Sequence, residues 1–270
     1  MKFSIENQDK VNKFVHIFKN AKMISKEVNI SLTAEGMHVQ GMDPSHVGIF
    51  ELRLKADWFT TYECKHEQFI GVNCEIISNI LNCIMDGQIM KWSYMYDSSE
   101  DLLIYFENCG MDKMFEVKLM NIDEEALGIP EMEYEVDIKI NSMGFEKIMN
   151  QLNLFGENLE IECGKDENIY MRTTGDAGKM QVRLKEADIV EYAYDDEVEL
   201  NIEFSLRYMA MFAKFSKLNT VCSIHLSRNQ PLKLLYDLNS WMEGDDEDIE
   251  IENYIRFYLA PKIDNDVDSD

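Results

Sequence analysis

The sequence predicts an α+β protein made of two similar halves. Three observations support this prediction: four windows have helical periodicity, most of the remaining chain alternates as strands do, and corresponding helices are evenly spaced. The helical windows are 10–22, 74–86, 143–155 and 205–217. Lys13 and Lys147 are 134 positions apart and Ile77 and Met209 are 132 apart, close to half of the 270 residues. This offset indicates an internal duplication.

Each helical window places apolar side chains three and four positions apart, so that they share one face. These faces hold Val11, Phe14, Val15 and Phe18; Ile76, Ile77, Ile80, Leu81 and Ile84; Phe145, Ile148, Met149 and Leu152; and Leu206, Met209, Ala210 and Ala213. Opposite them we expect polar side chains, namely Lys13, His16 and Asn20; Ser78, Asn79 and Asn82; and Lys147, Asn150 and Gln151.

Strands are predicted where apolar and polar residues alternate. Phe115, Val117 and Leu119 alternate with polar neighbours, and Met180, Val182 and Leu184 do the same. The glycine-containing stretch 175–180 lacks the lysine–serine/threonine ending and the spacing of a phosphate-binding loop, so we interpret it as a hairpin turn.

The segment 121–135 separates the two halves. It is rich in acids and contains Gly128-Ile129-Pro130. Because proline disfavours helix at the residue before it, we expect an extended linker here.

The composition excludes several classes of protein. Hydrophobic residues make up 46% of the chain, enough for a sizeable core. No apolar run approaches a membrane span, and the first ten residues lack the apolar region of a secretory signal. Six cysteines without paired spacing indicate reduced thiols in an intracellular protein. Cys64 and His66 have no partner pair at zinc spacing, and the five histidines sit in no triad-like context, so we expect no metal, no cofactor and no catalytic residues.

Charge is unevenly distributed along the chain. The formal net charge is −25, and seven acids with no base lie in 243–252, which we interpret as a solvated loop. The four helical windows hold eight bases and three acids, a net charge of +5. One interpretation is ordinary helices with solvated lysines. The other is a single molecular face that avoids repelling phosphate while the remaining surface stays acidic.

Four strings carry a family resemblance. They are MDPSHVG at 42–48, KLMNIDEEALGIPE at 118–131, LRYMAMFAKF at 206–215 and YLAPKI at 258–263. In this order and spacing the chain resembles the DNA sliding clamps of the proliferating-cell-nuclear-antigen family, from Phe3 to about Ile263. The resemblance implies two similar clamp domains per chain and a trimeric ring, with helices lining a pore and antiparallel sheets outside. We expect an N-terminal domain at 1–119, a connecting loop at 120–135, a C-terminal domain at 136–263 and an acidic tail at 264–270.

The resemblance also implies three sets of site residues. The bases expected to face DNA are Lys10, Lys13, Lys19, Lys22, Lys147, Arg207 and Lys214, of which Lys10 and Lys22 are only possible replacements for bases that other clamps carry. Asn79, Asn82, Asn150 and Leu154 stand where related clamps usually carry basic residues or histidine. The expected groove for a partner peptide comprises Met42, His46, Val47, Ile49, Leu127, Ile129, Tyr134, Pro231, Tyr258, Leu259, Ala260 and Pro261. The expected subunit interface comprises Cys83, Phe115, Val117, Leu152, Phe155, Met180 and Val182.

The function implied is that of a DNA polymerase processivity factor. Expected partners are duplex DNA bound without sequence preference, two further copies of the chain, and DNA polymerase, clamp loader, flap endonuclease and DNA ligase through clamp-interaction peptides. No membrane partner is expected. The site of action would be the nucleus, or a viral replication factory if the source is viral. Two alternatives stay open: a subunit of a heterotrimeric or checkpoint-type clamp, and an acidic DNA mimic or chaperone-like protein.

Overall fold

The computed structural model describes residues 1–95, 101–123, 127–164, 168–239 and 251–262. The chain divides into two compact units. Unit 1 contains Met1–Gly128 and Asp237–Ile255, and unit 2 contains Ile129–Tyr236 and Arg256–Asp270. The predicted boundaries assigned 237–255 to the C-terminal domain, whereas contacts group the described residues of this segment, 237–239 and 251–255, with unit 1.

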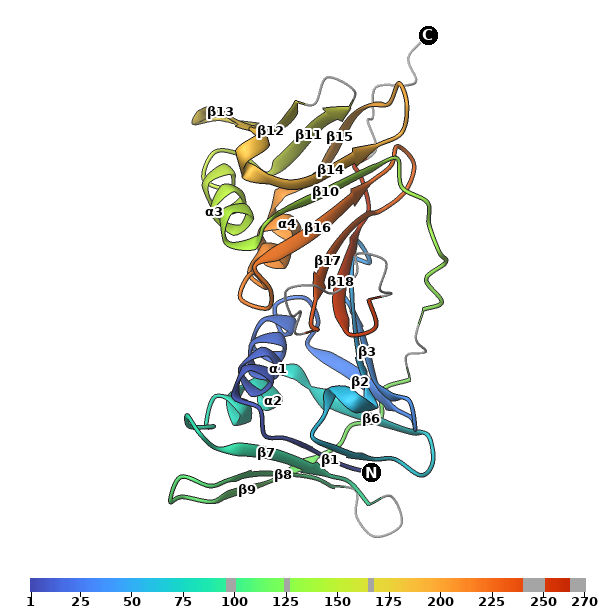
Figure 1. Ribbon diagram of the computed structural model, residues 1–270, viewed down its shortest axis with the longest axis vertical. Coiled ribbons are helices and arrows are strands. Elements are labelled where there is room, and N and C mark those ends of the chain that lie inside the picture. The colour runs from blue at the N-terminus through green and yellow to red at the C-terminus, as the bar shows by residue number, and fades with distance from the viewer. Residues whose placement is uncertain (96–100, 124–126, 165–167, 240–250, 263–270) are drawn as a thin grey trace. The chain divides into compact units, whose positions relative to one another are not determined.

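Unit 1 combines a pair of helices with two antiparallel sheets (Figure 1). Its five-stranded sheet has the order β5 (Thr61–Glu63), β1 (Lys2–Ile5), β7 (Ile89–Ser93), β8 (Asp101–Glu107) and β9 (Lys113–Lys118). The other sheet runs β4 (Gly48–Lys55), β3 (Gly36–Met42), β2 (Glu27–Leu32) and β6 (Gln68–Asn73), with the 3-10 turn η1 (Ala56–Trp58) after β4. Helix α1 (Gln8–Ala21) packs against α2 (Cys74–Leu81). Rings of Phe3, Phe14, Phe18 and Trp92 meet in the core.

Unit 2 repeats this plan (Figure 1). One sheet runs β13 (Gly178–Leu184), β12 (Ile169–Gly175), β11 (Asn158–Gly164) and β15 (Glu199–Ser205). The other runs β14 (Ile189–Tyr194), β10 (Val136–Asn141), β16 (Val221–Leu226), β17 (Leu232–Asp237) and β18 (Tyr254–Leu259), and η2 (Glu186–Asp188) precedes β14. Helix α3 (Ser142–Leu152) packs against α4 (Leu206–Ala213). In the core, the ring of Phe257 stacks on Phe212 and meets Phe215 at a tilted angle.

All four predicted helices are present, and asparagine caps define three of their starts. The side chains of Asn7, Asn73 and Asn141 accept hydrogen bonds from the first-turn amides of α1, α2 and α3. Helices α2, α3 and α4 end before their predicted windows do, at Leu81, Leu152 and Ala213. The apolar residues beyond these ends lie in or just after turns, not in helix.

Some side chains on the helices face differently from the prediction. Ile76 was placed on an apolar face but is 50% exposed. Conversely, Asn20 and Ser78 were predicted to be solvated and are buried. Because helices are paired within each unit, the neighbouring helix covers part of the face that an isolated amphipathic helix would expose.

The predicted strands and turn are confirmed. Burial alternates along β9 and β13 as the sequence pattern requires. Strands β12 and β13 form a hairpin in which Gly175 pairs with Gly178, leaving a two-residue turn. Residues 121–123 and 127–135 contain no helix or strand, as expected of an extended linker. The acidic run 243–252, except for its last two residues, and the tail 264–270 lie outside the described residues.

Candidate nucleic-acid, subunit and peptide interfaces

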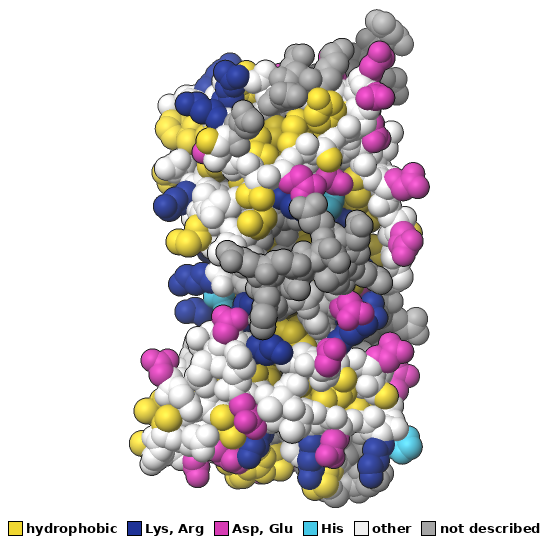
Figure 2. All heavy atoms as spheres, viewed as in Figure 1, with side chains coloured by type: hydrophobic (Ala, Val, Ile, Leu, Met, Phe, Trp, Pro, Cys, Tyr) yellow, Lys and Arg dark blue, Asp and Glu magenta, His cyan; other side chains and the backbone are white. Residues whose placement is uncertain are grey.

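Exposed bases on the helices form the first candidate site. Lys19 lies in the last turn of α1, Lys147 on α3, Arg207 at the start of α4, and Lys214 caps its end. All four side chains are exposed, and Lys22 after α1 is half-buried. By contrast, acidic side chains are scattered over the visible face of each unit (Figure 2). These cations suit contacts with phosphate, which need no base readout.

Two predicted DNA-facing lysines have partners inside unit 1. The Lys10 ammonium donates to the carbonyl of Trp58 at 2.8 Å and lies 5.4 Å from the centre of its indole ring. Burial lowers the pKa of Lys10. The Lys13 ammonium lies 3.0 Å from the Asp9 carboxylate, and its side chain is only 12% exposed. Lys10 therefore does not extend from the open face of α1 as predicted, and Lys13 is less available than Lys19.

Four of the residues predicted at the subunit interface lie on two strands at sheet edges, Phe115 and Val117 on β9 and Met180 and Val182 on β13. β9 ends the five-stranded sheet of unit 1, and β13 ends the four-stranded sheet of unit 2. An edge strand presents backbone donors and acceptors that another chain can pair with. Phe115, Met180 and Val182 on these strands are half-buried, while Cys83 and Phe155 are exposed.

Two predicted interface residues belong to the core instead. Leu152 is completely buried and Val117 is 5% exposed. Leu152 closes the last turn of α3, and Val117 occupies the covered face of β9. They support the candidate interface from inside and offer almost no area of their own to a partner.

The loop between β3 and β4 is organised by one carboxylate. Asp43 is 4% exposed and accepts hydrogen bonds from the amides of Ser45 at 2.8 Å, Val47 at 2.8 Å and Gly48 at 2.6 Å. The loop places His46 in the left-handed region, with φ 59°. This arrangement explains the sequence MDPSHVG at 42–48. The buried carboxylate of Asp43 fixes the loop backbone so that the side chains of His46 and Val47 stay accessible.

The start of the linker is attached to unit 1 by two amide side chains. Gln40 donates to the carbonyl of Leu127 at 3.1 Å and accepts from its amide at 2.6 Å. Asn29 donates to the carbonyl of Ile122 at 3.0 Å. Between linker and sheet lies a pocket of about 520 Å³, whose apolar lining includes Met42, Phe69, Met120, Ile122 and Leu127.

In unit 2, Tyr134 is held from three sides. Its hydroxyl donates to the carbonyl of Pro231 at 3.3 Å, the Lys233 ammonium lies 4.8 Å from its ring centre, and the ring centre of His225 is 5.5 Å away. Burial raises the pKa of Tyr134 and lowers those of Lys233 and His225. For His225 burial outweighs the adjacent Asp137 carboxylate. Contacts with Pro231, Lys233 and His225 therefore restrain the ring of this half-buried tyrosine.

The predicted groove residues divide between the units. Unit 1 holds Met42, His46, Val47, Ile49 and Leu127, all at least partly accessible. In unit 2, Ile129, Tyr134, Pro231, Ala260 and Pro261 are also accessible, but Tyr258 is 5% exposed and Leu259 is completely buried. Leu259 is therefore wrong as a groove-lining side chain, and Tyr258 contributes little area. Both lie on β18, in which five of the six residues are buried.

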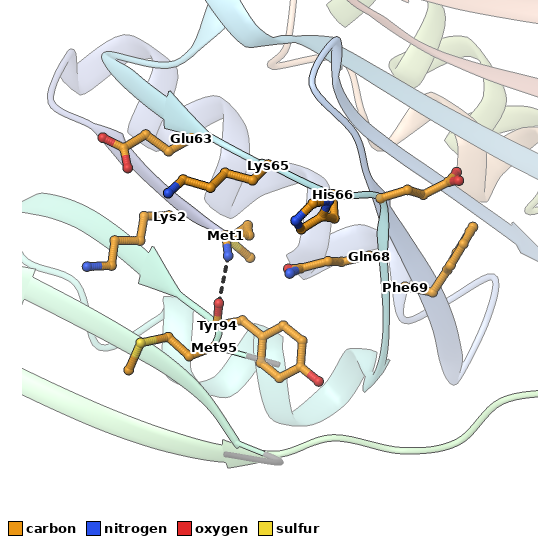
Figure 3. A pocket seen from close by; sticks show the side chains of 10 residues that line it. Met1, Lys2, Glu63, Lys65, His66, Gln68, Phe69, Tyr94 and Met95 are labelled. Atoms are coloured by element: carbon orange, nitrogen blue, oxygen red, sulfur yellow. Dashed lines mark hydrogen bonds between the residues drawn. The ribbon is translucent and has the colours of Figure 1, made fainter. Parts of the chain in front are cut away.

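Unit 1 contains a second, larger pocket of about 880 Å³ beside the N-terminus (Figure 3). The Met1 ammonium donates to the carbonyl of Tyr94 at 2.7 Å. Lys2, Lys65 and Glu63 lie on one side of the pocket, whereas Phe69 lies on the other. The mixture of charges favours no single class of ligand, and this pocket was not anticipated from the sequence.

Other classes of site find no support among the described residues. There, no group of three histidine, cysteine or acidic side chains is arranged to hold a metal ion. Within the same part of the chain, no helix is long and apolar enough to cross a membrane.

Two units that each combine a helix pair, two antiparallel sheets and an edge strand, joined by an extended linker, define the class of DNA sliding clamps. Comparison with protein families agrees. Residues 5–126 match the N-terminal domain of proliferating cell nuclear antigen, and residues 128–262 match its C-terminal domain. The chain is 33% identical over 252 residues to the proliferating cell nuclear antigen of Chaetomium thermophilum, covering 91% of this chain and 92% of that protein. The chain therefore belongs to the proliferating cell nuclear antigen family and is a sliding clamp, a processivity factor of DNA replication. Members of this family are nuclear, non-enzymatic scaffolds that bind DNA and replication proteins.

Several residues of these sites were missed by the sequence interpretation. Gln40 and Asn29 lie on the outward face of β3 and β2, where alternation could have placed them. What alternation does not reveal is that their amides bind linker backbone. Phe69 is 63% exposed. The available sequence signal was an aromatic residue placed directly after the polar residues 65–68.

Proposed function

We propose that this chain forms a homotrimeric ring that encircles duplex DNA and tethers replication enzymes. Two units per chain and three chains give six similar units around a pore. The mechanism is topological: a closed ring leaves DNA only by opening, so a bound polymerase keeps a high effective concentration at its template. The clamp itself has no active site in this proposal.

The observation that carries the proposal is the position of β9 and β13. Each lies at the edge of its own sheet, one in each unit, so one chain offers two different edges. Pairing β9 of one chain with β13 of the next is a heterologous contact, which closes into a ring when the rotation is right. The accessible Phe115, Met180 and Val182 would be covered by that contact.

DNA contact is assigned to the exposed bases Lys19, Lys147, Arg207 and Lys214. These bases are few, because positions where related clamps usually carry basic residues or histidine are asparagine here, namely Asn79, Asn82 and Asn150. A small number of phosphate contacts gives weak, sequence-independent attraction, which suits sliding better than tight binding.

Peptide binding is assigned to the accessible groove residues of both units. Tyr134 and Leu127 are aromatic and aliphatic contacts fixed by hydrogen bonds, which lowers the entropy cost of binding. DNA polymerase, clamp loader, flap endonuclease and DNA ligase would bind here through clamp-interaction peptides. The acting compartment would be the nucleus, or a viral replication factory in a host cell.

Solution mass tests the proposal first. Light scattering coupled to size exclusion at micromolar protein should give about 95 kDa for three chains of 31.6 kDa. A 31.6 kDa species would contradict the homotrimer and favour a heterotrimeric clamp subunit. Binding of a clamp-interaction peptide, and loss of that binding in Leu127→Ala, then tests the groove. Competition with DNA for a DNA-binding protein would instead favour an acidic DNA mimic.

A further inference from the structure

A completely buried glutamine joins three segments of unit 1. Gln88 precedes β7 and is 0% exposed. Its side-chain oxygen accepts hydrogen bonds from the amide of Met85 at 3.0 Å and the ammonium of Lys113 at 3.4 Å. Its side-chain nitrogen donates to the carbonyls of Met111 at 2.6 Å and Asn108 at 3.3 Å. A glutamine amide has two donors and an acceptor oxygen with two lone pairs, so this side chain is fully satisfied.

The partners of Gln88 surround the beginning of the β9 edge. Asn108 and Met111 belong to the turn between β8 and β9, and Lys113 is the first residue of β9. The Lys113 ammonium also donates to the carbonyl of Cys83 at 2.6 Å, just beyond the end of α2. The edge strand is therefore connected to α2 through Lys113 and Gln88.

The turn held by Gln88 has an unfavourable backbone conformation. Asn108, Cys109 and Gly110 have φ values of 74°, 61° and 80°. Two of these residues are not glycine, and such residues adopt positive φ at an energetic cost. Gln88 binds the carbonyl of Asn108 within this stretch and that of Met111 just after it, so it restrains the turn at the residues with positive φ.

A second glutamine fixes the backbone of Gln88 itself. The side chain of Gln8, at the start of α1, accepts from the amide of Gly87 at 3.0 Å and donates to the carbonyl of Gln88 at 3.0 Å. The buried side chain thus projects from a backbone that is attached to α1 and restrained independently of the turn.

We propose that Gln88 is a positioning residue for ring assembly: by ordering the β8–β9 turn, it presents the first residues of β9 for pairing with a second copy of the chain. This role rests on the proposed homotrimer. An edge strand whose end is disordered must be ordered on association, and that entropy cost weakens the contact.

The test replaces Gln88 by glutamate, which has the same shape. A carboxylate cannot donate to the carbonyls of Asn108 and Met111, so the turn loses both restraints. Amide hydrogen exchange in 107–114 should increase, and dilution measured by mass photometry should show a trimer dissociation constant about tenfold higher. Asn201→Asp, an exposed amide-to-carboxylate change on β15 and outside the predicted sites, is the matched control and should alter neither value.

Asn108→Gly in the Gln88→Glu background separates positioning from general damage. Glycine adopts positive φ readily, so it should restore part of the exchange protection and of the trimer affinity. No such rescue is expected if the variant has merely lost core packing. A trimeric wild type whose Gln88→Glu variant keeps both values would overturn this role alone. A monomeric wild type would overturn the homotrimer and the interface role with it, while exchange in 107–114 would still show whether Gln88 orders the turn.

Discussion

Replacing Asp43 by alanine should destabilise the β3–β4 loop strongly. Its buried carboxylate accepts three backbone hydrogen bonds, from Ser45, Val47 and Gly48. A hydrogen bond to a charged group contributes about 1.5–3 kcal/mol, but three bonds to one carboxylate are not additive. Pro44, Ser45 and His46 are exposed, so water can satisfy part of the loop after substitution. We therefore expect a loss of about 3 kcal/mol in the free energy of unfolding.

The assay is urea unfolding, combined with amide exchange to locate the effect. With a slope of about 2 kcal/mol/M, the midpoint should fall by about 1.5 M, and exchange at Ser45, Val47 and Gly48 should rise. Asp43→Asn keeps an oxygen for Val47 and Gly48 but places an NH₂ group opposite the Ser45 amide, so it should cost about 1 kcal/mol. Asp196→Ala, at an exposed turn, should stay within about 0.5 kcal/mol of wild type. An Asp43→Ala variant that also stays within that limit would refute the assigned role of the carboxylate.

Three further predictions follow from the site. Burial lowers the pKa of His225, so the unfolded chain takes up this proton first as pH falls below about 6.5. Wild type should therefore lose more stability than His225→Gln between pH 7.5 and 5.5 in urea titrations, and equal losses would contradict this prediction. For DNA, each of Lys19→Ala, Lys147→Ala, Arg207→Ala and Lys214→Ala should reduce the slope of log affinity against log salt by about 0.9 if that base contacts phosphate. Lys10→Met should leave the slope unchanged, and a reduced slope for Lys10→Met would show that its contact with Trp58 is released on DNA. Finally, maleimide at neutral pH should label Cys83 and Cys109 quickly, because both are exposed. It should label Cys74, Cys163 and Cys222 slowly, because burial raises the pKa of each of these thiols to about 12. Trimer formation should slow the labelling of Cys83, and equal rates in monomer and trimer would argue against its place at the interface.

Elements with one covered face were predictable from sequence. Strands β9 and β13 have one buried and one accessible face, and alternation reports that condition directly. The hairpin before Gly178 and the extended linker followed from glycine and proline chemistry. By contrast, Asn20 and Ser78 were misplaced because a helix paired with another has more than one covered face, which a single apolar stripe does not describe.

The candidate sites were less predictable because they depend on neighbours distant in sequence. Leu259 is apolar because it fills the core, as most apolar residues do, since both faces of β18 are largely covered. Lys10 was predicted as a possible DNA-facing base, although its ammonium binds the carbonyl of Trp58, 48 positions away. The Gln40 and Gln88 contacts go mainly to backbone atoms, which have the same chemistry at every residue, so no side-chain pattern encodes them.

Because the amide of Gln40 binds backbone atoms, the attachment of the linker does not depend on the side chain at position 127. Gln40 binds the amide and carbonyl of residue 127 and leaves its side chain, 48% exposed, without a role in that attachment. In the proposed peptide groove, substitution at 127 would therefore change the side chain offered to a client peptide while both hydrogen bonds from Gln40 to the linker are kept. A change at position 40, by contrast, would remove both hydrogen bonds to residue 127 and would need a replacement contact to hold this part of the linker.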